Sequence, residues 1–352
     1  MMKDKILKLP KIGTIIACIM IVLVYFALTR PCIAVCRTLL QEQVSGVYFN
    51  YAISEGVKSL VSLLILLTLG YKAVLKEKGQ GFFHGLYVGG VWLVFSISSI
   101  MLQLYLGILS HNSEFCSVGE ITAFAITMFL VGITEEVLLR GVILNLLLER
   151  FSVWPAVIIE SLIFGAIHFT NVLAGASFIA VFWQVVSATL GGVLLSAIYV
   201  RGKNIWVVIA IHGIYDFAGL FQSGVLGMGT PVENIGSTEP SWLLYLLMLL
   251  LAIYLLRKRK NAGSGDAVLS VLFGLFSIVM GFTGIFWSIG VMGILAAKSS
   301  QKAQPEKNKF AKVGMILSII GTVASFAAAV GLVLYFGAMS EIEKYYFLKK
   351  LF

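Results

Sequence analysis

The sequence predicts an all-α membrane protein: a bundle of about eight spans, followed by a C-terminal unit of two or three membrane helices. Of its 352 residues, 59% are hydrophobic and only 12% are charged, whereas soluble domains average about 25% charged residues. The apolar residues form continuous runs rather than the alternating segments of a membrane β-barrel. The net charge of +9 arises from lysines and arginines clustered between these runs. That pattern is typical of cytoplasmic loops beside anionic lipid, so it indicates contact with the bilayer and no nucleic-acid partner.

The first apolar run, residues 12–29, follows four lysines at positions 3, 5, 8 and 11. This start resembles a signal peptide, but the run is long and no small-residue cleavage motif follows it. We therefore expect a retained first helix with a cytoplasmic N-terminus, ended by Arg30-Pro31. A second span, residues 56–75, completes an N-terminal segment of membrane helices, residues 1–84.

Six further spans are predicted within a core of residues 85–256. Pro155 suits the first turn of a helix, and Gly191-Gly192 would allow close helix packing. With the N-terminus inside, alternating spans place every basic loop on the cytoplasmic side, as the positive-inside rule requires. We expect a multi-pass protein of the bacterial plasma membrane. The six spans cover residues 85–109, 120–148, 154–171, 177–200, 205–221 and 242–256, and the basic loops cover residues 72–78, 150, 201–203 and 257–260.

A basic, Gly- and Ser-containing linker, residues 257–266, leads to the C-terminal unit, residues 267–352. Its first apolar run, residues 267–297, is long for one span and contains Gly281 and Gly284. Two short helices turning at these glycines would keep the basic loop at residues 298–312 inside. A last span is expected at residues 313–336.

The four cysteines show no zinc or redox spacing. Cys18 lies within the first apolar run, where packing is the expected role. Cys32, Cys36 and Cys116 fall in loops on the same outer side, so either a disulfide among them or free thiols fits the sequence.

Three charged residues, Glu135, Glu136 and Arg140, lie inside the apolar run at residues 120–148. Charges at membrane depth are costly and usually face a bundle interior or a polar cavity. Glu136 and Arg140 are four residues apart with the acid first, which favours an intrahelical ion pair. Glu135 is rotated by about 100° around the helix and can meet another helix. A purely structural ion-pair cluster is the alternative.

Two of the chain's four histidines also lie in predicted spans. His168 follows Phe164 by four residues, and Asp216 follows His212 by four, so each pair shares a helical face. Phe164 would form a wall against the imidazole of His168. A single buried histidine is more often structural, but polar motifs on three helices favour a shared site. A further acid in these spans, Glu160, has no predicted partner.

These residue types suit hydrolysis. A carboxylate and an imidazole can deprotonate a water as it attacks a carbonyl carbon, and a second imidazole can stabilise the resulting oxyanion. No serine or cysteine nucleophile adjoins the histidines within their motifs, which favours direct water attack. Alternatively, Glu135, His168, His212 and Asp216 would bind a divalent metal such as zinc. The His-Glu-x-x-His signature of helical zinc sites is absent.

A shared site requires equal depth in the membrane. Counted from the cytoplasmic loops at about 1.5 Å per residue, Glu135 and His168 lie about 20 Å deep and His212 only about 10 Å. Helix tilt, or a seventh helix that starts below the surface, would remove this difference.

The ordered motifs Glu135-Glu136-x-x-x-Arg140, Phe164-x-x-x-His168 and His212-x-x-x-Asp216 resemble those of the CPBP family over about residues 85–256. This family comprises intramembrane proteases, among them type II CAAX prenyl endopeptidases and the Abi bacteriocin-processing and immunity group. The resemblance implies that Glu135 and His168 activate water, and that His212 and Asp216 form the oxyanion pocket. Glu136, Arg140 and Phe164 would support them. The family is called a metalloprotease, although a metal-free glutamate mechanism is also argued.

Asp216 departs from the CAAX enzymes, which often have Asn there. Neutral Asn can donate to an oxyanion, whereas an ionised Asp216 would hold His212 as imidazolium and leave it as the sole donor. The segment after Asp266 resembles small glycine-rich membrane domains of unknown function (the DUF4190 type), which implies no chemistry.

Three functions are compatible with these features. The first is an intramembrane endopeptidase acting on a membrane-associated peptide, either prenylated or of the bacteriocin or signal type. The second is a transporter that relays protons through intramembrane acids and histidines, although the chain shows no paired halves. The third is a non-catalytic membrane partner of the bacteriocin-immunity type.

Overall fold

The computed structural model describes residues 2–40, 46–79, 81–110, 115–173, 175–228, 242–256, 266–303 and 309–351, and every regular element within them is helical. Seven of the described helical segments are long and apolar enough to cross a membrane. The predicted all-α, multi-pass membrane bundle is therefore confirmed. The seven segments are Lys11–Leu40, Val47–Thr68, Trp92–Leu109, Val118–Leu148, Val153–Leu173, Phe178–Gly202 and Lys309–Ala338; Ile205–Gly219 and Asp266–Val279 are shorter apolar helices.

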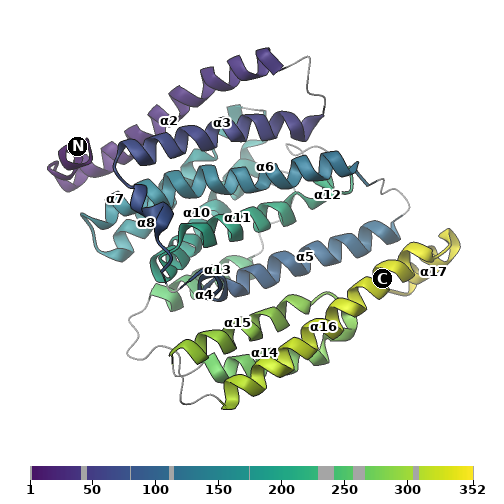
Figure 1. Ribbon diagram of the computed structural model, residues 1–352. Helices are drawn as coiled ribbons and strands as arrows, with labels where there is room; N and C mark the ends of the chain where they lie inside the picture. The colour runs from purple at the N-terminus through teal and green to yellow at the C-terminus, as the bar shows by residue number, and fades with distance from the viewer. Residues whose placement is uncertain are drawn as a thin grey trace. The chain divides into compact units, whose positions relative to one another are not determined.

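The chain folds into two compact units, each assembled from separate stretches of sequence (Figure 1). Unit 1 comprises Met1–Gly85, Ser117–Phe217 and Gly229–Arg257, and unit 2 comprises Leu86–Cys116, Ala218–Met228 and Lys258–Phe352. The sequence-based division at residues 84, 256 and 266 stays a prediction. Most of the predicted linker, residues 257–265, and the basic cluster at 257–260 lie outside the described residues.

Unit 1 begins with α1 (Met2–Leu7) and α2 (Lys11–Leu40). The expectation that Arg30-Pro31 ends the first span is wrong, because α2 continues through Pro31 to Leu40. A proline removes one backbone donor, but membrane helices tolerate it where neighbouring groups satisfy the backbone. Nearby, the buried Thr29 hydroxyl donates to the carbonyl of Phe26 at 3.3 Å.

The predicted second span is two elements, α3 (Val47–Thr68) and the 3-10 helix η1 (Lys72–Lys76). Helix α3 runs parallel to the helix that carries the paired glutamates. Thr127 donates to the carbonyl of Tyr48 at 3.2 Å, and Thr134 donates to that of Glu55 at 3.4 Å. A parallel second and fourth span is the relation that alternating topology predicts.

The glutamate-bearing span is continuous but changes its winding. It starts as α6 (Val118–Glu136), which Ser117 and Glu120 begin with a capping box. It then widens into a π-helix, η2 (Val137–Leu144), and ends as α7 (Asn145–Leu148). The Asn145 amide donates to the carbonyls of Arg140 and Gly141 at 2.8 and 3.2 Å, which satisfies backbone groups in the widened turns. Such π-segments are frequent at functional sites.

The remaining spans of unit 1 match the predicted order. Pro155 lies in the first turn of its helix, as predicted. Lys203, with φ of 50°, ends the sixth span in a left-handed turn. The elements are α8 (Val153–Ile167), α9 (Thr170–Leu173), α10 (Phe178–Gly202), α11 (Ile205–Gly219) and α13 (Trp242–Leu256).

In unit 2, the predicted turn between two short helices is confirmed: α14 (Asp266–Val279) and α15 (Trp287–Ala303) are joined through η3 (Gly281–Thr283). Gly284 there has φ of +64°, which favours glycine. Small residues allow α16 (Lys309–Ala338) to approach α14 closely, since a Cβ on Gly274 would lie 2.9 Å from the Ser318 backbone nitrogen. The other elements are α4 (Phe82–Val88), which begins in unit 1, α5 (Gly90–Leu109), α12 (Phe221–Gly224), α16 (Lys309–Ala338) and α17 (Glu341–Leu351), the last of which was not predicted.

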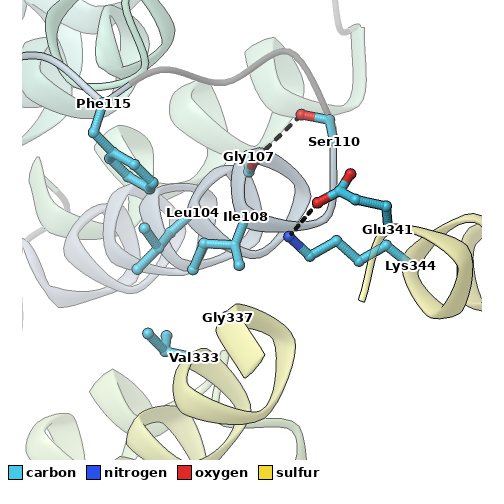
Figure 2. A pocket seen from close by; sticks show the side chains of 9 residues that line it. All are labelled: Leu104, Gly107, Ile108, Ser110, Phe115, Val333, Gly337, Glu341 and Lys344. Carbon is cyan, nitrogen blue, oxygen red and sulfur yellow. Dashed lines mark hydrogen bonds and ion pairs between the residues drawn. The ribbon is translucent and has the colours of Figure 1, made fainter. Parts of the chain in front are cut away.

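Unit 2 contains an open pocket of about 590 Å³ between α5 and the α16–α17 segment. Figure 2 shows the side chains that line it. Apolar side chains such as Leu104, Ile108 and Val333 line it, and a Glu341–Lys344 ion pair of 3.6 Å lies at one end. No residue predicted to be catalytic lines this pocket.

All four cysteines lie within the described residues, and no disulfide joins any two of them. Cys32 and Cys36 lie in helix α2 and not in the predicted loop. Cys18 is fully buried, in agreement with the predicted packing role, and Cys32 is exposed.

Candidate active site

Glu136 is the centre of a buried polar network in unit 1. Its side chain has no exposed surface, and Oε1 lies 2.9 Å from Nη1 of Arg140. The predicted intrahelical ion pair is therefore present. The same Oε1 lies 2.6 Å from Nδ1 of His212 on α11. A carboxylate only accepts hydrogen bonds, so Nδ1 carries the proton of this contact.

Arg140 connects the π-helix to two neighbouring helices. Its Nη2 donates to the carbonyl of Gly192 at 3.1 Å, and its Nε donates to Oγ of Ser196 at 3.3 Å. Its guanidinium stacks over the ring of Phe164 at 4.8 Å, a favourable cation–π geometry. Arg140 thereby fixes α8 and α10 around the buried end of η2.

Glu160, which the sequence left without a partner, belongs to this network. Its Oε1 lies 3.5 Å from Nε of Arg140, and its Oε2 accepts hydrogen bonds from Ser196 at 2.6 Å and Ser161 at 3.3 Å. Sequence reasoning did not identify Ser196 or Glu160 as network members. The sequence features that could have indicated them are the acid Glu160 inside one apolar run and Ser196 among the small residues of the next run.

The second ring nitrogen of His212 faces two acids. Its Nε2 lies 3.3 Å from Oδ2 of Asp216 and 3.6 Å from Oε2 of Glu135. The side chains of Glu135 and Asp216 are 29% and 24% exposed, whereas those of Glu136, Arg140 and Glu160 are completely enclosed. The network thus has a sealed half and an open half, and Glu135 lies in the open half, as its rotation around the helix predicts.

His168 lies at the other side of Phe164. It caps the C-terminus of α8, and its Nδ1 lies 3.0 Å from the carbonyl of Phe164. The Phe164 ring packs edge-on against both imidazoles, with centroid distances of 5.1 Å to His168 and 6.1 Å to His212. Glu135 is close enough to interact electrostatically with His168, His212 and Asp216. The four residues predicted as catalytic therefore converge.

The difference in depth counted from the loops does not keep His212 apart from the paired glutamates. Asn204 precedes this helix and accepts from the Trp206 amide at 3.0 Å, and its own amide donates to the carbonyl of Lys78 at 3.4 Å. The Trp206 indole donates to the carbonyl of Leu75 at 3.0 Å. Helix α11 thus begins against η1 and the loop that follows it. The 2.6 Å contact between His212 and Glu136 shows that the two residues lie at one level.

Two glycines bring α6 and α11 together. A Cβ on Gly132 would lie 2.8 Å from the carbonyl oxygen of Ile209, and one on Gly213 would lie 3.2 Å from that of Met128. Backbone atoms cannot yield easily, so the close crossing depends on the missing side chains. Gly192 plays the predicted role on α10, because a Cβ there would lie 3.0 Å from the Phe164 ring.

The observed geometry does not fit a metal centre. Among the described residues, no group of three or more His, Cys, Asp and Glu side chains is arranged to hold a metal ion. We therefore assign no chemical step to a metal.

Comparison with protein families supports a protease assignment. A family model described as "Type II CAAX prenyl endopeptidase Rce1-like" matches residues 117–218. That range contains all seven residues predicted for the site, and the match supports a CAAX-type intramembrane endopeptidase at the level of the family. The match does not reach the C-terminal segment, whose resemblance to DUF4190-type domains stays a prediction. No curated protein and no solved structure matches the chain.

Proposed function

We propose that this protein is an intramembrane endopeptidase that hydrolyses a peptide bond of a membrane-associated substrate, with water as the nucleophile. The observation that carries the proposal is the contact of His212 with Glu135, Glu136 and Asp216 inside a set of membrane helices. Of these acids, Glu135 and Asp216 are partly exposed, so a substrate can reach them, whereas Glu136 is enclosed. The family match over the same residues supports this reading.

Glu135 and His168 are the groups proposed to activate the water. The carbonyl of Phe164 can only accept, so Nδ1 of His168 carries a proton. In the neutral ring, Nε2 then has a free lone pair, which is what a general base needs. The partly exposed Glu135 carboxylate supplies a second acceptor for the same water.

His212 is proposed to stabilise the oxyanion. Its Nδ1–H is committed to Glu136, and its Nε2 faces two carboxylates, which would repel a bare lone pair. The group formed by Nε2, Glu135 and Asp216 must therefore hold at least one shared proton. A proton on Nε2 can be donated to a developing oxyanion. Asp216 at 3.3 Å orients this donor, while Glu136 and Arg140 fix the ring from behind.

Hydrolysis is proposed to proceed by attack of water on the carbonyl carbon of the peptide bond. The water oxygen bonds to the carbonyl carbon, its proton passes to Glu135 or His168, and the carbonyl oxygen becomes the oxyanion held by His212. The carbon–nitrogen bond then breaks, and the leaving amine takes up the proton that the base removed. The products are a carboxylic acid and an amine.

The substrate is proposed to be a peptide associated with the membrane. The name of the matched family refers to prenylated CAAX peptides. We therefore propose a peptide that reaches the site from the bilayer, and the assay should compare a farnesylated CAAX peptide with its unfarnesylated form. Purified protein in liposomes should cleave at least one of them.

The decisive variants are Glu135→Ala and His168→Ala. Each should reduce cleavage by about 10³-fold or more, because each removes a group that acts on the water. Gly56→Ala is a matched control on a neighbouring helix, since a Cβ there meets no atom within 4 Å. Cleavage that survives both active-site variants would refute the assignment. Treatment of the protein with a zinc chelator tests the alternative that a metal activates the water. We expect the cleavage rate to be unchanged after chelation.

The same variants separate the alternative functions. A non-catalytic immunity-type partner would still protect cells when both Glu135 and His168 are replaced by alanine. A proton-coupled transporter would lose uptake with Glu135→Gln and would release no peptide fragment. Mass spectrometry of the products therefore identifies the class directly.

A further inference from the structure

Two side-chain amides that the proposed chemistry does not use form a pair between α9 and α10. Nδ2 of Asn171 donates to Oε1 of Gln184 at 2.8 Å. Gln184 lies six residues beyond Phe178, where α10 begins, which is about 9 Å along the helix axis at about 1.5 Å per residue. Both amides belong to segments that are apolar enough to cross a membrane. Polar groups in such segments are costly unless they are hydrogen-bonded or face a polar cavity.

The pair retains hydrogen-bonding groups that this contact does not use. The contact leaves Oδ1 of Asn171 as an acceptor and both N–H groups of Gln184 as donors. Within the described residues, neither of these groups takes part in a hydrogen bond. Both residues are half-buried, so the pair is not sealed inside the protein. A donor beside an acceptor is the complement of one extended residue, whose backbone N–H and C=O point to the same side of the chain.

The amide pair lies beside His168. A Cβ on Gly165 would lie 3.2 Å from Cβ of Thr189 on α10. Six residues later, Asn171 meets Gln184, which precedes Thr189, so the two segments run in opposite directions. His168 stands midway between Gly165 and Asn171 in the sequence, and its carbonyl accepts from the backbone N–H of Asn171 at 3.0 Å. The pair is therefore close to one helical turn from the histidine proposed to act on the water.

The spacing between His168 and the amide pair suits an extended peptide. One helical turn rises about 5.4 Å, and an extended chain advances about 3.3 Å per residue. A substrate whose scissile carbonyl lies at His168 therefore places the backbone of a residue about one or two positions away beside the pair. That backbone needs hydrogen-bond partners from the protein, because the bilayer core offers no water.

We propose that Asn171 and Gln184 form a subsite that binds the backbone of one substrate residue, within about two positions of the bond that is cut. This inference rests on the proposed function and adds a positioning element to it. Nε2 of Gln184 donates to the substrate carbonyl, and Oδ1 of Asn171 accepts from the substrate N–H. Because both contacts are made with backbone atoms, the subsite fixes the register of the chain at His168 without selecting a side chain.

The test measures binding to the substrate backbone. Glu135→Gln protein in nanodiscs is titrated with a farnesylated CAAX peptide and with a series in which one backbone N–H at a time is replaced by an ester oxygen. One ester position should bind about 5- to 10-fold more weakly than the parent peptide, the loss expected for one hydrogen bond. The double variant Asn171→Leu/Gln184→Met in the same background should bind that ester and the parent peptide within about twofold of each other. With wild-type protein, mass spectrometry should place the cut within about two residues of the sensitive position.

Two further variants control for a structural role of the pair. Thr122→Val removes one side-chain hydrogen bond at an exposed position on α6 and should keep the ester effect. The exchanged pair Asn171→Gln/Gln184→Asn restores an amide on each segment and should recover the preference for the parent peptide, even if the double variant folds poorly.

Equal binding of the parent peptide and of every ester to the Glu135→Gln protein would overturn the inference, as would a parent peptide that does not bind. An ester effect that persists unchanged in the double variant would also overturn it, because the pair would then only join α9 to α10.

A cleavage assay separates this inference from the proposed function. If the wild type cleaves the peptide but the ester effect is the same with and without the amide pair, the subsite fails while the protease assignment stands. If the ester effect depends on the pair but the wild type releases no fragment, the protease assignment fails and the peptide-binding subsite stands.

Discussion

The guanidinium of Arg140 compensates the charge of two buried acids. Arg140 is in ion-pair range of both Glu136 and Glu160, and none of the three side chains has exposed surface. Burying an ion pair is costly, and removing one partner is costlier, because the remaining charge loses its compensation. The network behind His212 therefore depends on Arg140 more than on any single hydrogen bond.

Replacing Arg140 with methionine tests this dependence. The variant keeps a long side chain but leaves Glu136 and Glu160 without their cation, so the free energy of unfolding should fall by about 3–5 kcal/mol. Adding Glu160→Gln should recover part of that loss, because one uncompensated acid is removed. Thermal unfolding in detergent measures both changes. Arg30→Met, at an exposed position on α2, is the control. An unchanged unfolding midpoint for Arg140→Met would contradict the role assigned to the network.

The contacts that the sequence predicted at this scale are the local ones. Glu136 with Arg140, Phe164 with His168 and His212 with Asp216 are each four residues apart, and helix geometry alone brings such residues together. The contacts between helices could not be predicted in the same way. The pairing of Glu160 with Arg140 depends on the rotation and depth of separate helices, which no spacing within one helix specifies.

The crossing of helices α6 and α11 positions the residues of the candidate site. Gly132 and Gly213 let the two backbones approach, which places Glu135 and Glu136 against His212. The π-helix that follows changes the direction of Arg140 relative to a regular helix, and Asn145 satisfies its carbonyls. The sequence indicated a helix here, but hydrophobic periodicity does not reveal a change in winding.

Gly132→Val should separate the two helices. Its Cβ would meet the carbonyl oxygen of Ile209 at 2.8 Å, and backbone cannot move aside as a flexible side chain can. We expect kcat/KM to fall by about 10²-fold or more, since a displacement of about 1 Å is enough to misalign a catalytic group. Gly56→Val on α3 is the matched control, since a Cβ there meets no atom within 4 Å. It should leave kcat/KM within about twofold, because substitutions that create no clash or cavity change little. Equal rates for wild type and Gly132→Val would show that the crossing does not position the site.

Pro31 lies inside helix α2, although the sequence predicted that it would end the helix. The rule that proline ends a helix is derived largely from water-soluble proteins, where a freed carbonyl can bond to solvent. Within a long apolar helix, leaving the helical conformation would expose more backbone groups than the proline does. Helix α2 therefore continues to Leu40, nine residues beyond the proline.

The candidate site lies entirely within one of the two compact units of the molecule. All seven residues of the candidate site belong to unit 1. Unit 2 combines residues 86–116 with the C-terminal helices, and its core includes Tyr105, Leu109 and Phe336. The sequence predicted the helical class, the span order and the turn at residues 281–284. It could not show which distant helices pack together, because that depends on matching surfaces rather than on local pattern.

A truncation after Leu256 tests whether the C-terminal helices of unit 2 contribute to the reaction. The shortened chain keeps every residue of the proposed site but removes Phe336, against which Tyr105 and Leu109 pack. We expect kcat per correctly folded molecule to stay within about threefold of the full-length value. The reason is that the transition state is stabilised by the groups positioned around it, all of which the truncated chain keeps. The unfolding midpoint should fall, since about 2 kcal/mol or more is lost when a large aromatic contact is removed from a core. The truncated protein should be compared with the full chain by size-exclusion profile, helical circular dichroism and cleavage rate. A monodisperse, helical truncation without any cleavage would mean that unit 2 contributes directly to the reaction.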